Sequence, residues 1–213
     1  PTVNYRESIG AKTQFTYLHR KQTGGAGQYA KVIGYVEPIN DDITDPDADM
    51  SNVFKNATEG QNIPNEYVPA IEKAFHEFTK RGPKTGYLVV GMRYVLTDGN
   101  THVVDSSSMA FQIATKYSCN TTWDKASPLI LEPIMDVEVT VPAEYQGGVM
   151  GQLLKRRGNV TNTETRTGLF ILNADVPLAS MFGYATELRG STQGIGEFSM
   201  EYRMHSPVGE FDV

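Results

Sequence analysis

The order of strand and helix patterns in residues 128–213 constrains the fold of this chain more than any other feature. Apolar alternation predicts strands over residues 130–141, 159–165, 169–176 and 197–204. Helical patterns lie between them, and they begin at Pro142 and Pro177 and run to residues 157 and 189. Pro133 predicts a break or bulge in the first strand. This βαββαβ order is that of the ferredoxin-like fold, and we expect a frayed tail from His205 onward.

Residues 1–127 have a different organisation. Strand patterns cover residues 3–8, 15–20, 29–38, 88–96 and 102–105. One amphipathic helix is predicted over residues 64–81, with apolar side chains at Val68, Ile71, Phe75 and Phe78. Gly82-Pro83 is expected to stop it. A second helix is predicted over residues 109–116 after the N-cap candidates Ser106 to Ser108, and residues 120–123 weaken its far end.

Three loops stand out in this first part. Residues 21–28 hold three glycines in four residues between two strands, which permits positive φ and close backbone approach. Asp98-Gly99 predicts a turn, followed by a second small polar loop around His102 that joins two strands. The stretch with Asp41, Asp42, Asp45, Asp47 and Asp49 is interpreted as a solvated loop, because the calcium-loop pattern ending in a bidentate Glu is absent.

Composition excludes several classes of protein. No apolar run of about 18 residues predicts a membrane span. The only cysteine, Cys119, excludes an internal disulfide and a cysteine metal cluster. The net charge is −6, and residues 128–213 carry 6 Lys and Arg against 11 Asp and Glu. We therefore expect no general affinity for RNA, although Arg20-Lys21 and Lys155-Arg156-Arg157 are compact basic spots. The second spot suits either an RNA contact or the dipole of a helix C-terminus.

The sequence has few of the patterns that signal catalysis. There is no P-loop, no Gly-x-Ser-x-Gly and no HExxH, and Gly24 to Gly27 precede a strand rather than a helix. A nucleophile system built from Asp98, His102, Asp105 and Ser106 remains an alternative hypothesis. Turn and capping chemistry explains the same residues and is the stronger interpretation. We accordingly expect no catalytic residue and no metal site.

Several long blocks closely resemble domains IV and V of elongation factor G. The first part carries Tyr5-Arg6-Glu7-Ser8-Ile9, His19 through Tyr29, Asn62-Ile63-Pro64, residues 70–75 and Asp98 through Ser106. The second carries Leu131 through Met135, Met181 through Arg189 and Ser191-Thr192-Gln193-Gly194. Residues 24–34, 144–147 and 200–202 are most similar to the mitochondrial form.

This resemblance implies an α+β chain of two domains. Residues 1–127 would form domain IV, a βαβ fold with a left-handed crossover, and residues 128–213 a ferredoxin-like domain V. The tip of domain IV would enter the decoding region of the small ribosomal subunit, contacting tRNA, mRNA and rRNA. The matching tip residues are Gln22, Gly24, Gly25, Gly27, Gln28 and His102. Arg189 and Gln193 match the domain V surface that faces the large subunit near the sarcin–ricin loop, where Ile195 replaces an Arg common in bacteria.

The resemblance also sets expectations for the parent protein. Pro1-Thr2-Val3-Asn4 has neither Met nor the features of a signal or transit peptide, and we expect a part of a longer translational GTPase. GTP and Mg would bind a domain outside these residues, so no cofactor is expected here, and the family's C-terminal helix is missing or shortened. We expect a monomer of the mitochondrial matrix that promotes translocation and has no membrane partner, with a bacterial or organellar cytoplasm as the alternative. A ribosome-recycling paralogue, a ribosome protection protein and a hydrolase using His102 are the other hypotheses.

Overall fold

The computed structural model describes residues 2–22 and 24–209, which form two compact units. Residues 5–131 make one unit, and residues 2–4 together with 132–209 make the other. Both mix helices with strands, so the predicted α+β class is confirmed. The division by compactness falls after Leu131, and the domain boundary between residues 127 and 128 stays a prediction. No helix among the described residues is long and apolar enough to cross a membrane.

The first unit is built on a four-stranded sheet in the order β2-β3-β5-β4. The strands are β2 (Thr13–Lys21), β3 (Gln28–Pro38), β5 (Met92–Asn100) and β4 (Val53–Asn56). β4 pairs with β5 in parallel, with a helix between them in the chain, which gives the predicted βαβ unit. β4 has no counterpart among the predicted strands, and the left-handedness of the crossover stays a prediction.

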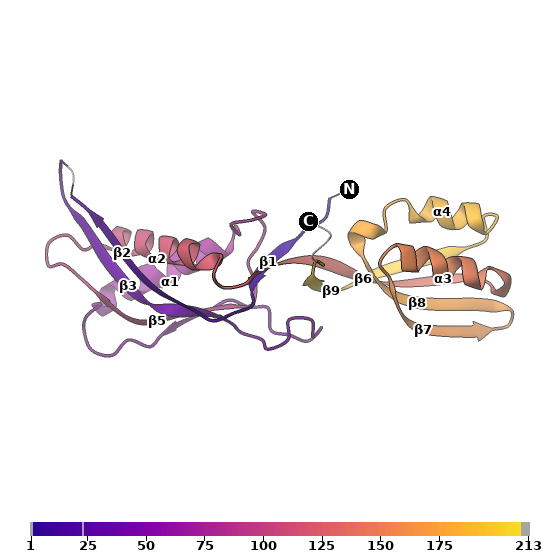
Figure 1. Cartoon of the computed structure of the whole chain (residues 1–213), viewed down its shortest axis with the longest axis horizontal. Coiled ribbons are helices and arrows are strands. Elements are labelled where there is room, and N and C mark those ends of the chain that lie inside the picture. The colour runs from indigo at the N-terminus through magenta and orange to yellow at the C-terminus, as the bar shows by residue number, and fades with distance from the viewer. Residues whose placement is uncertain (1, 23, 210–213) are drawn as a thin grey trace. The chain divides into compact units, whose positions relative to one another are not determined.

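Two helices, α1 (Val68–Thr79) and α2 (Ser108–Trp123), cover one face of that sheet (Figure 1). Ile71, Phe75 and Phe78 are buried in the core with Phe111, as the periodicity of α1 predicts. A 3-10 turn, η1 (Asn65–Tyr67), precedes α1. A short strand, β1 (Arg6–Ile9), pairs with residues 128–131.

Two features of the first unit differ from their predictions. Asp98 and Gly99 lie inside β5 and not in a turn. A Cβ at position 99 would lie 2.2 Å from the carbonyl oxygen of Lys31, which explains why this residue is a glycine. Here the glycine permits close strand approach. The second helix continues beyond the predicted residue 116 to Trp123. The hydroxyls of Thr115 and Thr122 donate to helix carbonyls, so both side chains are buried with their hydrogen bonds made. The predicted strand at residues 102–105 is a loop.

The second unit confirms the βαββαβ order. Its strands are β6 (Pro128–Pro142), β7 (Asn159–Arg166), β8 (Leu169–Pro177) and β9 (Glu197–Pro207), with β8 between β6 and β7 and with β9 on β6. The helices α3 (Gln146–Lys155) and α4 (Tyr184–Ser191) follow 3-10 turns η2 (Ala143–Tyr145) and η3 (Leu178–Ser180) and lie on one face of the sheet (Figure 1). β6 continues through Pro133, so the predicted break is wrong, although its pairing with β1 ends at Leu131 and that with β8 begins at Ile134.

The predicted frayed tail is also wrong as far as the structure describes it. β9 extends to Pro207, and His205 is buried. Its Nε2 donates to the backbone carbonyl of Asn4 (2.8 Å), while the hydroxyl of Tyr202 donates to its Nδ1 (2.7 Å). Both ring nitrogens of this histidine are therefore bonded, and the Nε2 bond joins β9 to Asn4. Residues 210–213 lie outside the described residues.

Candidate functional site

Two loops meet at one end of the four-stranded sheet. The first lies between β2 and β3 and is described at residues 22 and 24–27, and the second joins β5 to α2 through residues 101–107. The sequence predicts two strand-to-strand loops, and the second instead leads into a helix. Figure 1 shows the first loop at the tip of the long β2–β3 hairpin.

Ser106 and Tyr29 tie the two loops together. The Tyr29 amide donates to the carbonyl of Asp105 (2.9 Å), and the Ser106 hydroxyl donates to the carbonyl of Tyr29 (2.7 Å). The same hydroxyl accepts from the amide of His102 (2.9 Å). One of these bonds joins two backbone groups, and the other two join a backbone group to the short side chain of Ser106. The second loop is thereby held against the start of β3, where the first loop ends.

His102 has a defined tautomer in this arrangement. Its Nδ1 accepts from the amides of Val104 and Asp105, both at 3.2 Å, so that nitrogen carries no proton in the neutral ring. The proton is then on Nε2, and the side chain is about half exposed. His102 therefore organises its own loop with one nitrogen and offers a hydrogen-bond donor with the other.

The predicted glycines have separate physical roles. Gly24 has φ +57°, a conformation that L side chains rarely adopt. A Cβ on Gly27 would lie 2.8 Å from the carboxylate of Asp105, so only glycine lets the two loops approach this closely. Gly25 meets no such restriction. The backbone thus favours glycine at Gly24, close packing requires it at Gly27, and the structure gives no reason for it at Gly25.

Gln22 in the first loop and Gln28 at the start of β3 are unlike each other. Gln22 is exposed next to the exposed basic pair Arg20 and Lys21. Gln28 is half-buried, and its Oε1 accepts from Nε2 of His19 at 2.7 Å across the hairpin. Gln28 therefore stabilises the hairpin, whereas Gln22 is free to reach a partner.

Sequence reasoning missed an apolar feature of the second loop. Val103 is fully exposed and Val104 is 81% exposed, beside His102. Two β-branched residues in a row predict a strand, and that prediction gave no indication that their side chains would be exposed. An exposed aliphatic pair next to a polar donor suits contact with the flat faces of a partner and has no role in folding this unit.

The geometry gives no support to a nucleophile system at this site. The Ser106 hydroxyl donates to Tyr29, and Nδ1 of His102 is occupied by two amides. Asp98 accepts from the amide side chain of Asn62 (3.0 Å), which lowers the pKa of its carboxyl. The described residues thus lack the hydroxyl-to-histidine bond that activates a serine.

Carboxylates of the acidic loop cap their own backbone. Asp42, Asp45 and Asp49 accept from the amides two residues further on, each at 2.9 Å. These are Asx turns, which satisfy the loop without a cation. Within residues 2–22 and 24–209, no group of three or more His, Cys, Asp or Glu side chains is arranged to hold a metal ion.

In the second unit, Arg189 and Gln193 lie at the end of α4. Both side chains are exposed. Gln193 has φ +54° and is followed by Gly194 at φ +80°, whose amide donates to the carbonyl of Arg189 (2.9 Å). This is the six-to-one bond of a Schellman motif, which ends the helix and projects Gln193 beside the exposed Ile195.

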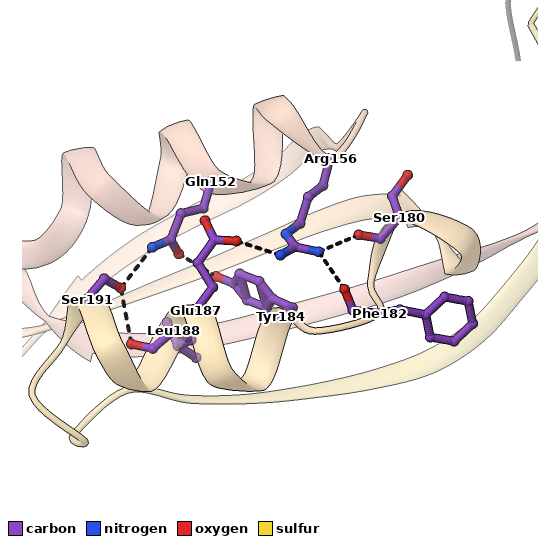
Figure 2. A network of polar contacts seen from close by, with 8 residues as sticks. All are labelled: Gln152, Arg156, Ser180, Phe182, Tyr184, Glu187, Leu188 and Ser191. Atoms are coloured by element: carbon purple, nitrogen blue, oxygen red, sulfur yellow. Dashed lines mark hydrogen bonds and ion pairs between the residues drawn. The ribbon is translucent and has the colours of Figure 1, made fainter. Parts of the chain in front are cut away.

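The basic spot Lys155-Arg156-Arg157 is chiefly structural. The guanidinium of Arg156 donates to the carbonyls of Ser180 (2.6 Å) and Phe182 (3.1 Å) and pairs with Glu187, as Figure 2 shows. Arg157 forms two bonds, of 2.9 and 3.2 Å, with the buried Glu132. Both arginines join elements distant in sequence, and the two proposed roles, RNA contact and dipole complement, stay predictions.

Figure 2 also shows how α3 and α4 are joined beside that arginine. The buried Tyr184 donates to Oε1 of Gln152 (3.1 Å), and Nε2 of Gln152 donates to the hydroxyl of Ser191 (2.8 Å). Burial raises the pKa of Tyr184 to about 12. This network fixes α4, the helix that presents Arg189, against α3.

Comparison with known proteins gives the same family for both parts of the chain. The family model described as elongation factor G, domain IV, matches residues 1–127, and that described as elongation factor G C-terminus matches residues 129–211.

Individual relatives cover almost the whole chain. The mitochondrial elongation factor G of Drosophila virilis is 48% identical over 207 residues, 97% of this chain and 27% of that protein. Elongation factor G 2 of Bdellovibrio bacteriovorus is 46% identical over 210 residues, 98% of this chain and 29% of that protein. A crystal structure of a Thermus thermophilus protein matches with a TM-score of 0.81 at 34% identity and covers 99% of this chain and 30% of that one. The chain therefore spans less than a third of the length of these relatives.

Proposed function

The chain belongs to the elongation factor G family, and from this premise we propose that it is the ribosome-contacting part of a factor that moves tRNA and mRNA during protein synthesis. The two loops joined by Ser106 and Tyr29 would enter the decoding region. They would hold moved tRNA and mRNA in place by occupancy, without making or breaking bonds. The cross-linking of these loops is the observation that carries the proposal.

The chemistry of the loops supports contact with RNA. Arg20 and Lys21 are exposed at the end of β2, and among the described residues neither forms an ion pair, so both are available to phosphates. His102 supplies a donor from Nε2 to a base edge or a 2′-hydroxyl. Gln22 supplies an amide with both donor and acceptor. Binding groups of several kinds thus lie on these two loops and at the end of β2.

Arg189 and Gln193 are proposed to contact rRNA of the large subunit. Their exposure at the end of α4, supported by the network of Figure 2, favours a rigid contact. Ile195 beside them replaces a charge with an apolar side chain, so that part of the contact would rely on packing.

The parent protein would be a GTPase whose GTP and Mg bind outside these residues. These 213 residues would supply no catalytic group and no cofactor site. We propose a monomer working with mitochondrial ribosomes, in line with the 48% identity to a mitochondrial factor. The 46% identity to a bacterial factor makes bacterial ribosomes the comparison to run.

The direct experiment fuses this chain at Pro1 to the GTPase-bearing front of a bacterial elongation factor G. Movement of mRNA is followed by toeprinting, and GTP hydrolysis is measured in the same reactions on bacterial and mitochondrial ribosomes. Movement by one codon is the expected result. Hydrolysis without movement on either ribosome would contradict translocation and favour the recycling paralogue.

His102→Ala in this chimera tests the role of the tip. The change removes the Nε2 donor and the acceptor for two loop amides. We expect translocation to slow about tenfold, which corresponds to the loss of one hydrogen bond of about 1.4 kcal/mol in the transition state. Ribosome-stimulated GTP hydrolysis should be unchanged.

The matched control is His76→Ala, at a half-exposed histidine on α1 remote in sequence from both loops. It should alter neither measurement. Equal loss of translocation and hydrolysis in His102→Ala would remove His102 from the tip assignment.

A further inference from the structure

A groove between α1 and α2 has no place in the function proposed above. Its cavity volume is about 430 Å³, within the range of roughly 300–1,000 Å³ typical of binding pockets. Its floor is formed by Ala74, Phe78, Pro83 and Ile113, all apolar. The inner face of both helices packs on the sheet, and the groove lies on their outer face. No element among the described residues of the first unit covers it.

The two helices run in the same direction along this groove. The ring of Tyr67, just before α1, stacks on Phe111 near the start of α2 at 5.0 Å between centroids. Phe78, near the end of α1, meets Trp123 at the end of α2 at 5.7 Å. From Gln112 to Asn120 the α2 wall is about 12 Å long. A groove of that length accommodates about two turns of a third helix.

The rim of the groove is cationic. Arg81, two residues after the end of α1, and Lys116 on α2 line it, are exposed, and form no ion pair within the described residues. The one acidic side chain there, Glu77, is neutralised by Lys80 at 2.7 Å. Lys116 is the only charged residue in α2. In a chain of net charge −6, this face is locally positive and attracts an anionic partner.

We propose that this groove docks an acidic amphipathic helix of a partner protein. Leucine-like side chains on one face would fill the space above Ala74 and Ile113, and flanking carboxylates would pair with Arg81 and Lys116. A protein is favoured over RNA because RNA recognition relies on exposed aromatic rings for stacking. The one aromatic ring in this groove, Phe78, is 8% exposed.

The test uses the full chain and a labelled peptide of about 14 residues, with Leu at i, i+4 and i+7 and Glu on the flanks. Fluorescence anisotropy should detect binding that weakens as salt is added. The same peptide with Lys in place of Glu, and a single-stranded RNA, serve as competitors. Neither should displace it from the groove.

Two exposed charges provide the decisive variants. Arg81→Glu combined with Lys116→Glu should weaken peptide binding at least about tenfold. Lys55→Glu makes the same charge change on exposed β4 outside the groove and should leave binding unchanged. Circular dichroism checks that both variants remain folded.

Backbone NMR shifts on peptide addition should cluster in α1 and α2. The proposal is overturned if the acidic peptide does not bind, if Lys55→Glu weakens binding as much as the groove variant, or if the shifts fall elsewhere. It is also overturned if RNA displaces the peptide and depends on Arg81 and Lys116.

Discussion

At the scale of single residues, a buried carboxylate explains one of the glycines. Glu7 on β1 is fully buried, yet it accepts from the amides of Lys84 (3.0 Å) and Thr85 (2.9 Å) and from the Thr85 hydroxyl (2.8 Å). Hydrogen bonds to a carboxylate offset the cost of its burial. Gly82 lies against it, since a Cβ there would be 1.9 Å from Oε2. The sequence predicts that Gly82 stops α1, but that helix already ends at Thr79.

Gly82→Ala should therefore destabilise the first unit by about 2–4 kcal/mol, because either the backbone or the carboxylate must move. Urea unfolding followed by the fluorescence of Trp123, the only tryptophan and buried in this unit, measures it. Gly25→Ala is the control, because its Cβ would meet nothing within 4 Å. Equal midpoints for both variants would refute the explanation.

Tyr184 gives a pH dependence with a definite sign. Its pKa is raised by burial from 10.0 to about 12, so the folded state retains the proton that the unfolded state loses first. Its stabilising contribution is complete below pH 10 and is lost as pH rises toward about 12.

Tyr184→Phe should lessen the fall in stability across that interval, measured by urea unfolding at several alkaline pH values. The ultraviolet titration of tyrosinate should also lose a late component. Tyr94, whose pKa burial shifts in the same direction, remains in the variant as the internal control. A variant titration that matches the parent would contradict the assignment.

At the scale of elements, one device begins three helices. Pro64, Pro142 and Pro177 each have φ near −57° and ψ near 140°, and each precedes a 3-10 turn that leads to α1, α3 or α4. The helical patterns therefore predicted the right segments, but the α-helices begin four to seven residues after the prolines. A proline at a helix start leaves the type of the first turn open, and packing decides it.

The ends of α3 and α4 show what the sequence did not reveal. Each helix ends in a Schellman motif whose left-handed residue is not glycine but Arg157 or Gln193, with glycine one position later. At α3, a Cβ on Gly158 would lie 2.6 Å from the carbonyl of Leu153, which explains that glycine. Arg157 in its left-handed conformation forms an ion pair with Glu132, and this pair joins residues 25 apart in sequence.

The candidate site was predictable in its parts but not in its assembly. Strand and turn chemistry identified both loops, and the family resemblance named their residues. The bonds from Tyr29 and Ser106 that join them span 76 or 77 positions in sequence, and no local pattern reports such a contact. His19 and Gln28 are only nine positions apart, but their bond across the hairpin depends on the register of β2 and β3, which the sequence pattern does not specify.

At the scale of the whole molecule, the chain has two separate hydrophobic cores. One contains Ile71, Phe75 and Phe111, and the other contains Val139, Leu153 and Leu172. Units with their own cores unfold as separate cooperative steps when little else couples them. The second unit is discontinuous in sequence, because residues 2–4 belong to it through the bond from His205 to Asn4.

His205→Ala tests this division. It removes a buried side chain together with its bonds to the carbonyl of Asn4 and the hydroxyl of Tyr202, at a cost of about 1–3 kcal/mol to the second unit alone. Far-ultraviolet circular dichroism, which reports both units, should show an earlier first transition in urea, while the midpoint of Trp123 fluorescence stays unchanged. Gly82→Ala should instead lower the midpoint of Trp123 fluorescence, together with the part of the circular dichroism change that belongs to the first unit. If both probes shift together in both variants, the two cores fold as one cooperative unit, and His205 then stabilises the whole chain rather than one domain of it.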